Sequence, residues 1–200
     1  MRSIAVFLAA LTLAACGGSS QKLEKLSAGV VVLAFGDSLT FGTGASPGES
    51  YPAQLEALIG RRVVNAGVPG EASEEGLERL PGVLDDVKPA MLLLCHGGND
   101  FLRKMDDGRA AQNVRAMVRL ARDRNIQVVL IATPKPTLPP SVPAFYREIA
   151  SEARVGFVDA VMKEVLSDRD LKSDLVHPNA KGYREIAKAV EKALKQGGAI

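Results

Sequence analysis

The chain has 200 residues, of which 46% are hydrophobic and 24% charged, and 25 basic against 23 acidic side chains give a formal net charge of +2. This composition is typical of one globular domain and excludes an intrinsically disordered chain. Because no basic tract stands out, the sequence gives no support for binding to nucleic acid.

The N-terminus has the pattern of an export signal. Arg2 supplies a positive charge, and Ile4 to Ala15 form an apolar run in which Thr12 is the only polar residue. Such a run is short for a membrane span but suits the core of a signal peptide. It ends in Leu13-Ala14-Ala15-Cys16, which resembles the lipobox of bacterial lipoprotein signals, where the cysteine is lipidated and becomes the first mature residue.

We therefore expect residues 1–15 to be a signal peptide, Cys16 to carry lipid, residues 16–28 to form a polar tether and residues 29–200 to form the domain. A simple secretory signal with an incidental cysteine is the alternative. Gly17, rather than an aspartate, follows Cys16, and by resemblance to Gram-negative lipoproteins this indicates the outer membrane, facing the periplasm. With Cys16 lipidated, only Cys95 remains as a thiol, so stability is expected to come from packing and not from disulfides.

From Val30 onward, strand patterns alternate with helical patterns. The predicted strands are Val30–Phe35, Arg62–Asn65, Ala90–Cys95, Gln127–Ala132 and Gly156–Val158. The predicted helices are Tyr51–Ile59, Ser73–Val87, Arg109–Arg124, Ala144–Ala153, a short segment near Ala160–Leu166 and a final helix near Ala180–Lys195. The third strand is a continuous apolar run, as expected when helices cover both faces of a sheet. The alternation predicts a three-layer α/β/α domain with a parallel sheet.

Polar, glycine-rich stretches follow the first three predicted strands. They are Gly36-Asp37-Ser38-Leu39, Asn65-Ala66-Gly67-Val68-Pro69-Gly70 and Gly97-Gly98-Asn99-Asp100. Each alone could be an ordinary strand end, since Gly, Asp, Ser and Asn are common turn residues. Ligands of open α/β sheets collect outside the carboxyl ends of the strands, so the three stretches together predict a site at one rim of the sheet.

Ser38 is the candidate nucleophile in the first of these stretches. A serine hydroxyl attacks well only when a base accepts its proton. Of the two histidines, His177 is the better base, because Asp174 lies three residues before it and could orient the imidazole. The alternative for this last motif, Asp174-Leu175-Val176-His177-Pro178-Asn179, is that Asp174 and Asn179 serve only as turn and cap residues.

An acyl-transfer site also needs hydrogen-bond donors for the oxyanion. The N–H groups of Ser38 and Gly70 and the side-chain amide of Asn99 are the candidates, and glycine lets a backbone N–H approach a ligand closely. A plain turn role is the alternative for Asn99. We expect the other histidine, His96, to pack or hydrogen-bond near its strand end, with a place in the pocket wall as the alternative.

In this order, GDSL, NAGVPG, GGND and DLVHPN resemble the four blocks of the SGNH (GDSL) hydrolase family. The likeness runs from about Val30 to the end and is greatest for the bacterial periplasmic thioesterase, lysophospholipase and arylesterase branch. It implies a flavodoxin-like, five-stranded parallel sheet and a serine hydrolase acting on carboxylic esters or thioesters, with no metal or organic cofactor. It also implies that Ser38, Asp174 and His177 form the triad, that Ser38, Gly70 and Asn99 form the oxyanion hole, and that Asp37 orders the loop.

The chain departs from that branch in the Pro-rich segment 133–140 and in the loop 41–50, both of which would border the site. The particular substrate of the family branch is therefore not carried over to this chain. The expected substrate is a small-molecule or lipid ester, and deacetylation of a cell-wall or other polysaccharide is the alternative. Two non-enzymatic alternatives are a flavodoxin-like binder of phosphate or FMN and a lipoprotein that keeps the fold without turnover. FMN binding gives no role to the Asp174 and His177 pair.

Overall fold

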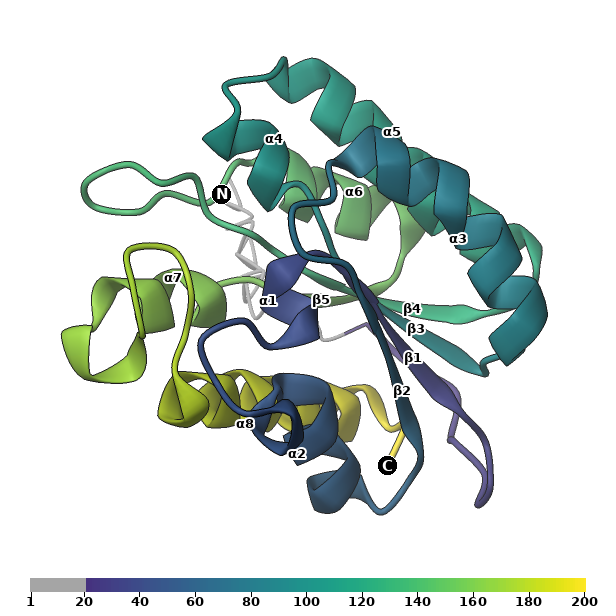
Figure 1. Cartoon of the computed structure of the whole chain (residues 1–200). Helices are drawn as coiled ribbons and strands as arrows, with labels where there is room; N and C mark the ends of the chain where they lie inside the picture. Colours follow the sequence, from purple (N-terminus) through teal and green to yellow (C-terminus); the bar gives the residue numbers. More distant parts are fainter. Residues whose placement is uncertain (1–20) are drawn as a thin grey trace, which may run out of the picture.

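A parallel sheet forms the centre of the computed structural model, which describes residues 21–200 (Figure 1). The predicted signal peptide and Cys16 lie outside the described residues. The strands are β1 (Val32–Gly36), β2 (Val63–Gly67), β3 (Met91–Cys95), β4 (Gln127–Ile131) and β5 (Gly156–Val158). They form a five-stranded sheet in the order β2-β1-β3-β4-β5, and every neighbouring pair is parallel. The predicted fold class is confirmed.

Helices cover both faces of this sheet. The helices are α1 (Ser38–Phe41), α2 (Tyr51–Ile59), α3 (Ser73–Val87), α4 (Gly98–Leu102), α5 (Asp107–Asp123), α6 (Phe145–Ala153), α7 (Val161–Ser167) and α8 (Ala180–Gly197), with 3-10 turns at Pro47–Glu49 and Arg169–Leu171. One core packs α2, α7 and α8 against the sheet, and the other packs α3, α5 and α6 against its opposite face. The chain is thus a three-layer α/β/α sandwich.

The apolar runs of the sequence form the centre of the sheet because their side chains enter both cores. In β1, Val32 and Ala34 belong to the core with α8, whereas Leu33 and Phe35 belong to the core with α3 and α5. All five residues of β1 and all five of β3 are buried. Successive side chains of a strand point to opposite faces, so a strand buried on both sides needs a continuous apolar run.

Two short helices at the carboxyl edge of the sheet, α1 and α4, were not among the predicted elements. The sequence predicted a turn after β1 and a loop after β3. Each helix has only four or five residues, which is too short for an apolar period to show. Their starts are set locally: the Asp37 side chain caps α1 by accepting from the Leu39 N–H, and Gly97, with φ of 107°, precedes α4.

The described part of the predicted tether, residues 21–28, packs against the domain. Leu23 and Leu26 are buried beside α8, and their N–H groups donate to carbonyls at the end of that helix, both at 2.8 Å. Glu24 exchanges two backbone-to-side-chain hydrogen bonds with Gln127, the first residue of β4. The structure therefore differs from the predicted tether of residues 16–28, because the two buried leucines fix residues 21–28 to the amino edge of the sheet.

Candidate active site

Ser38 lies at the carboxyl edge of the sheet, as the first residue of α1. Asp37, just before it, is 1% exposed, and its Oδ1 accepts the Leu39 N–H at 2.9 Å. Burial raises the pKa of the Asp37 carboxyl, although the neighbouring His96 and the Leu39 N–H favour the charged form. Asn65, at the end of β2, donates to the Thr40 carbonyl at 3.0 Å and so ties α1 to the sheet. Contacts of Asp37 and Asn65 therefore hold the turn that carries Ser38.

The loop before α8 brings His177 to Ser38. The Nε2 atom of His177 lies 3.0 Å from the Ser38 Oγ, and its Nδ1 lies 2.8 Å from the Asp174 Oδ2. A carboxylate can only accept, so Nδ1 carries the ring hydrogen and Nε2 is free to accept from the serine hydroxyl. The structure thus brings these three predicted residues together in one hydrogen-bonded chain.

Asp174 stays ionised in this arrangement. Slight burial would raise its pKa, but the hydrogen bond with His177 and the N–H groups of Val176 and His177, both at 2.8 Å, lower that pKa below its usual range. The loop that carries the pair is closed by an antiparallel bridge between Lys172 and Pro178. Asn179 then caps α8 by accepting from the Gly182 N–H at 3.1 Å, as the sequence predicts.

The three predicted oxyanion donors come from three separate segments at this edge: α1, the loop after β2 and α4. Gly70 has φ of 83°, a left-handed conformation that favours glycine, and Arg103 donates to its carbonyl at 2.5 Å. Within residues 21–200, the N–H groups of Ser38 and Gly70 donate to no other protein group. The Asn99 amide donates to the Glu71 carbonyl at 3.0 Å and to the Asp37 Oδ2 at 3.4 Å, so an oxyanion would take over the longer of these two hydrogen bonds.

His96 is fully buried and hydrogen-bonded near the end of β3, as expected, and it is not exposed as a residue of a pocket wall would be. Its Nε2 lies 3.0 Å from the Glu71 carboxylate, and its carbonyl accepts from the Tyr146 hydroxyl at 2.6 Å. The sequence analysis did not assign a role to Glu71 or Asn65. A polar residue at the end of a predicted strand was the only signal for Asn65, and Glu71 gave none.

The family model of the GDSL-like lipase/acylhydrolase family matches residues 34–185, a stretch that contains all of these motifs. The chain belongs to the GDSL-like lipase/acylhydrolase family. It is 30% identical over 179 residues to Thioesterase 1/protease 1/lysophospholipase L1 of Escherichia coli K12, with 86% of each chain covered. It is 29% identical over 187 residues to Esterase TesA of Pseudomonas aeruginosa, which covers 86% of this chain and 92% of the relative.

Among solved structures, the crystal structure of AlinE4, an SGNH-hydrolase family esterase, is similar with a TM-score of 0.66 at 31% identity, covering 86% of this chain and 98% of the other. This GDSL-like hydrolase is therefore an SGNH serine esterase, related to esterases, thioesterases and lysophospholipases. The predicted enzyme class is confirmed, and the comparisons favour it over the FMN-binding alternative.

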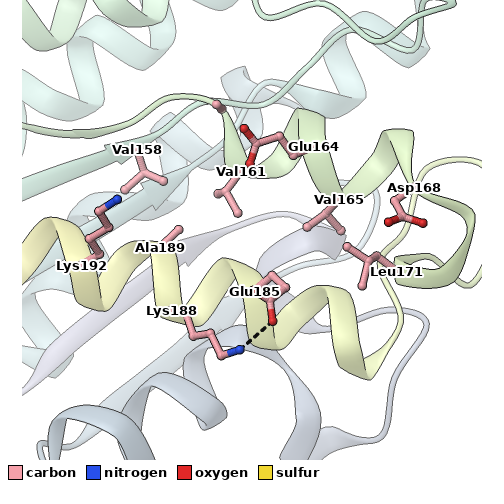
Figure 2. A pocket seen from close by; sticks show the side chains of 11 residues that line it. Val158, Val161, Glu164, Val165, Asp168, Leu171, Glu185, Lys188, Ala189 and Lys192 are labelled. Carbon is pink, nitrogen blue, oxygen red and sulfur yellow. Dashed lines mark hydrogen bonds and ion pairs between the residues drawn. The ribbon is translucent and has the colours of Figure 1, made fainter.

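A hollow of about 550 Å³ lies between α7 and α8 (Figure 2). Val161, Val165 and Ala189 form its apolar floor, and the ion pair of Lys188 with Glu185, at 2.8 Å, lies at its rim. It shares no residue with the predicted site. Over residues 21–200, no three His, Cys, Asp or Glu side chains gather as a metal site requires, and no helix is long and apolar enough to cross a membrane.

Proposed function

We propose that the chain hydrolyses carboxylic esters and thioesters, such as aryl esters, acyl thioesters or lysophospholipids, with Ser38 as nucleophile, His177 as general base and Asp174 as its partner. One observation carries this proposal: the unbroken hydrogen-bonded chain from the Ser38 Oγ through both ring nitrogens of His177 to Asp174. The relatives support the substrate classes, since their names include thioesterase, lysophospholipase and arylesterase.

The reaction follows from this geometry. As the Ser38 Oγ attacks the carbonyl carbon, its proton passes to the Nε2 of His177, and Asp174 stabilises the imidazolium that forms. The carbonyl oxygen becomes an oxyanion, which accepts from the N–H groups of Ser38 and Gly70 and from the Asn99 amide. His177 then gives the proton to the departing alkoxide or thiolate. Water attacks the acyl-enzyme by the same steps in reverse and releases the carboxylic acid.

A hollow next to α4, which shares no residue with the proposed triad or oxyanion donors, is the candidate place for the acyl chain of the substrate. This hollow of about 490 Å³ begins at Phe101, two positions beyond Asn99 on α4, and extends to Met105 and to Pro136 of the Pro-rich segment. Its lining is mixed: Phe101, Met105 and Pro136 are apolar, Thr137 is polar, and Lys104, Asp106, Asp107 and Lys135 are charged, with Lys135 and Asp107 forming an ion pair. Such a lining suits an apolar acyl or aryl group with a polar end.

We also propose that residues 1–15 direct export, that Cys16 carries lipid and that the protein works in the bacterial cell envelope, anchored to the outer membrane. The packing of residues 21–28 bears on how it would sit there. Leu23 and Leu26 are docked at the amino edge of the sheet, whereas Ser38 lies at the carboxyl edge. An anchored domain would therefore open its active site away from the membrane that holds Cys16.

A hydrolysis panel on the form lacking residues 1–16 tests this function. Aryl esters from acetyl to palmitoyl are assayed beside an acyl-CoA, a lysophospholipid and acetylated sugars, with Ser38→Ala as the matched control. We expect wild-type turnover of aryl esters and of the thioester or lysophospholipid, and none with Ser38→Ala. Turnover confined to acetylated sugars would replace this substrate class with polysaccharide O-acetyl esters, and a wild type inert toward every ester would overturn the proposal.

A further inference from the structure

Glu71 directly follows the proposed oxyanion donor Gly70, and its carboxylate is one of the few buried acids of the described chain, with the residue 7% exposed. Both carboxylate oxygens are engaged. The Arg79 Nε donates to Oε1 at 2.6 Å and the Arg79 Nη2 to Oε2 at 2.7 Å, which is a two-point guanidinium contact. Two parallel N–H bonds fix the direction of a carboxylate as well as its position.

The fully buried His96 supplies the third contact. Its Nδ1 accepts the Gly97 N–H at 3.1 Å, so the ring hydrogen is on Nε2, which donates to the Glu71 Oε2 at 3.0 Å. Gly76 of α3 lies against this ring, and a Cβ at that position would come within 2.2 Å of the Nε2. The imidazole therefore has one orientation, with the hydrogen directed at Glu71.

Glu71 remains charged in its buried place. Burial alone would raise the pKa of this carboxyl, but the hydrogen bonds from Arg79 and His96 outweigh it and lower the pKa to about 2. Arg79 is itself fixed, because its guanidinium lies 4.1 Å from the centroid of the Phe35 ring and its Nη2 donates to the Ala66 carbonyl at 3.1 Å. The contacts of Glu71 thus reach β1, β2 and the end of β3.

The backbone of the same residue touches the proposed oxyanion hole twice. The Glu71 carbonyl accepts from the Asn99 amide at 3.0 Å, and the Glu71 amide nitrogen is bonded to Gly70, the other donor from outside α1. We propose that Glu71, clamped by Arg79 and His96, is a positioning residue that sets the places of the Gly70 N–H and the Asn99 amide relative to Ser38. This inference rests on the proposed function, because it concerns the donors of that site.

The clamp has a distinct kinetic consequence. Oxyanion donors act on charge that develops in the transition state, so their displacement lowers kcat and leaves KM nearly unchanged. A misplacement of about 1 Å by a residue outside the reacting atoms can cost roughly 10²-fold in rate. A purely structural role for Glu71 would instead lower the melting temperature and leave kcat of the folded protein unaltered.

The experiment compares Glu71→Ala and Arg79→Lys with Leu84→Ala in the form lacking residues 1–16. Leu84 is a 3% exposed core residue of the same helix as Arg79, so its truncation destabilises α3 without touching the clamp. Arg79→Lys keeps the charge but cannot make the two-point contact. For each variant, kcat and KM are measured on an aryl ester, together with the melting temperature and the affinity for a boronic acid that forms a tetrahedral adduct on serine.

We expect Glu71→Ala to lower kcat by about 30- to 100-fold, with KM changed less than about threefold and boronic acid affinity lowered in parallel with kcat. Arg79→Lys should lower kcat by about 3- to 10-fold in the same pattern, and it keeps the test open if Glu71→Ala fails to fold. A loss in kcat no larger than that of Leu84→Ala, or one matched by a rise in KM, overturns the positioning role. Because the wild type is assayed beside them, a wild type without esterase activity overturns the proposed function instead.

Discussion

The Nε2 of His177 lies 3.0 Å from the Oγ of Ser38, although the two residues are 139 positions apart in the sequence. Ser38 follows β1, the first strand along the chain, and His177 precedes α8, the last helix. The contact therefore joins the start and the end of the domain. α8 packs on α2 and on β5, and it carries the His177 loop to the carboxyl edge. The packing of α8 against the rest of the sandwich therefore brings the proposed base and nucleophile together.

Ser38→Ala should abolish ester hydrolysis without loss of folding. The hydroxyl is the proposed attacking atom, and removing it leaves the Asp37 cap of α1 intact. A fluorophosphonate should label Ser38, as located by peptide mass spectrometry. Ser50 and Ser73, which are 1% and 0% exposed, serve as internal controls and should stay unlabelled. Label on another serine, or turnover by the alanine variant, would contradict the assignment of the nucleophile.

Asn99→Ala should lower kcat by roughly 10²–10³, with KM little changed, because it removes one oxyanion donor. The measurement is steady-state kinetics on the aryl ester that the wild type hydrolyses fastest. Asn113 of α5, whose amide donates to the Ser73 hydroxyl at 2.9 Å, offers a matched control, since Asn113→Ala also removes a partly buried amide but no proposed oxyanion donor. An effect of Asn99→Ala on KM alone would mean that Asn99 binds substrate and transition state equally.

The pH dependence of kcat/KM should reflect protonation of His177 and not of Asp174. The pKa of Asp174 is lowered from its usual value, so its carboxylate stays charged over the range in which the imidazole takes up a proton. His177 must be neutral to accept the Ser38 proton, so kcat/KM should fall as the pH is lowered. Asp174→Asn should cut activity by about 10⁴-fold, since the amide favours the wrong tautomer. A flat acid limb, or a fully active Asp174→Asn enzyme, would argue against this triad.

The central sheet could be predicted because its strands carry their own signal. Met91 to Cys95 is an unbroken apolar run, and the predicted bounds of α2, α3 and β5 agree with the structure. The contacts of His177 with Asp174 and Ser38 could be anticipated in outline, because Asp174 and His177 lie in one turn and Ser38 follows a strand. The short helices α1 and α4, of four and five residues, could not be predicted. Their starts depend on the Asp37 cap and on the left-handed conformation of Gly97, which are local features of a single turn.

The contacts of Glu71 with Arg79 and His96 could not be predicted from the sequence either. Arg79 is eight positions further on and His96 twenty-five, and nothing in their spacing marks a contact. Leu23 and Leu26 illustrate the same limit, since they occur in a polar stretch and are buried only because the end of α8 offers them an apolar surface. These interactions depend on how elements far apart in the sequence pack, which local patterns do not encode.

Asp37→Asn should stabilise the fold at neutral pH. Burial raises the folded-state pKa of Asp37 above the unfolded value of 3.8, so the charged form costs stability once the pH exceeds that value. Asparagine is neutral and can still accept the Leu39 N–H through its Oδ1, and it gives up only the longer contact of 3.4 Å that the Asp37 Oδ2 accepts from Asn99. The melting temperature of the variant should exceed that of wild type at pH 7, and the difference should vanish below about pH 3.8, where both side chains are uncharged. A variant less stable at pH 7 would show that the charge is needed there.

The last prediction concerns the anchor proposed at Cys16. A single acyl chain binds a membrane only marginally at about 0.8 kcal/mol per buried CH₂, whereas two or more hold firmly. Full-length protein expressed in a bacterial host with labelled palmitate should take up label and sediment with membranes, and Cys16→Ala should be unlabelled.

The same anchor predicts how the domain is oriented on the membrane. From Cys16 to residue 21, the first described residue, five residues span at most about 17 Å, so the amino edge of the sheet should face the membrane. Ser38, at the opposite edge, should stay open to solvent. Anchored protein in intact vesicles should then hydrolyse a soluble aryl ester with the same kcat/KM as the form lacking residues 1–16. Unlabelled, soluble wild-type protein would leave only a secretory signal, and a large loss of kcat/KM on anchoring would contradict the outward orientation of the site.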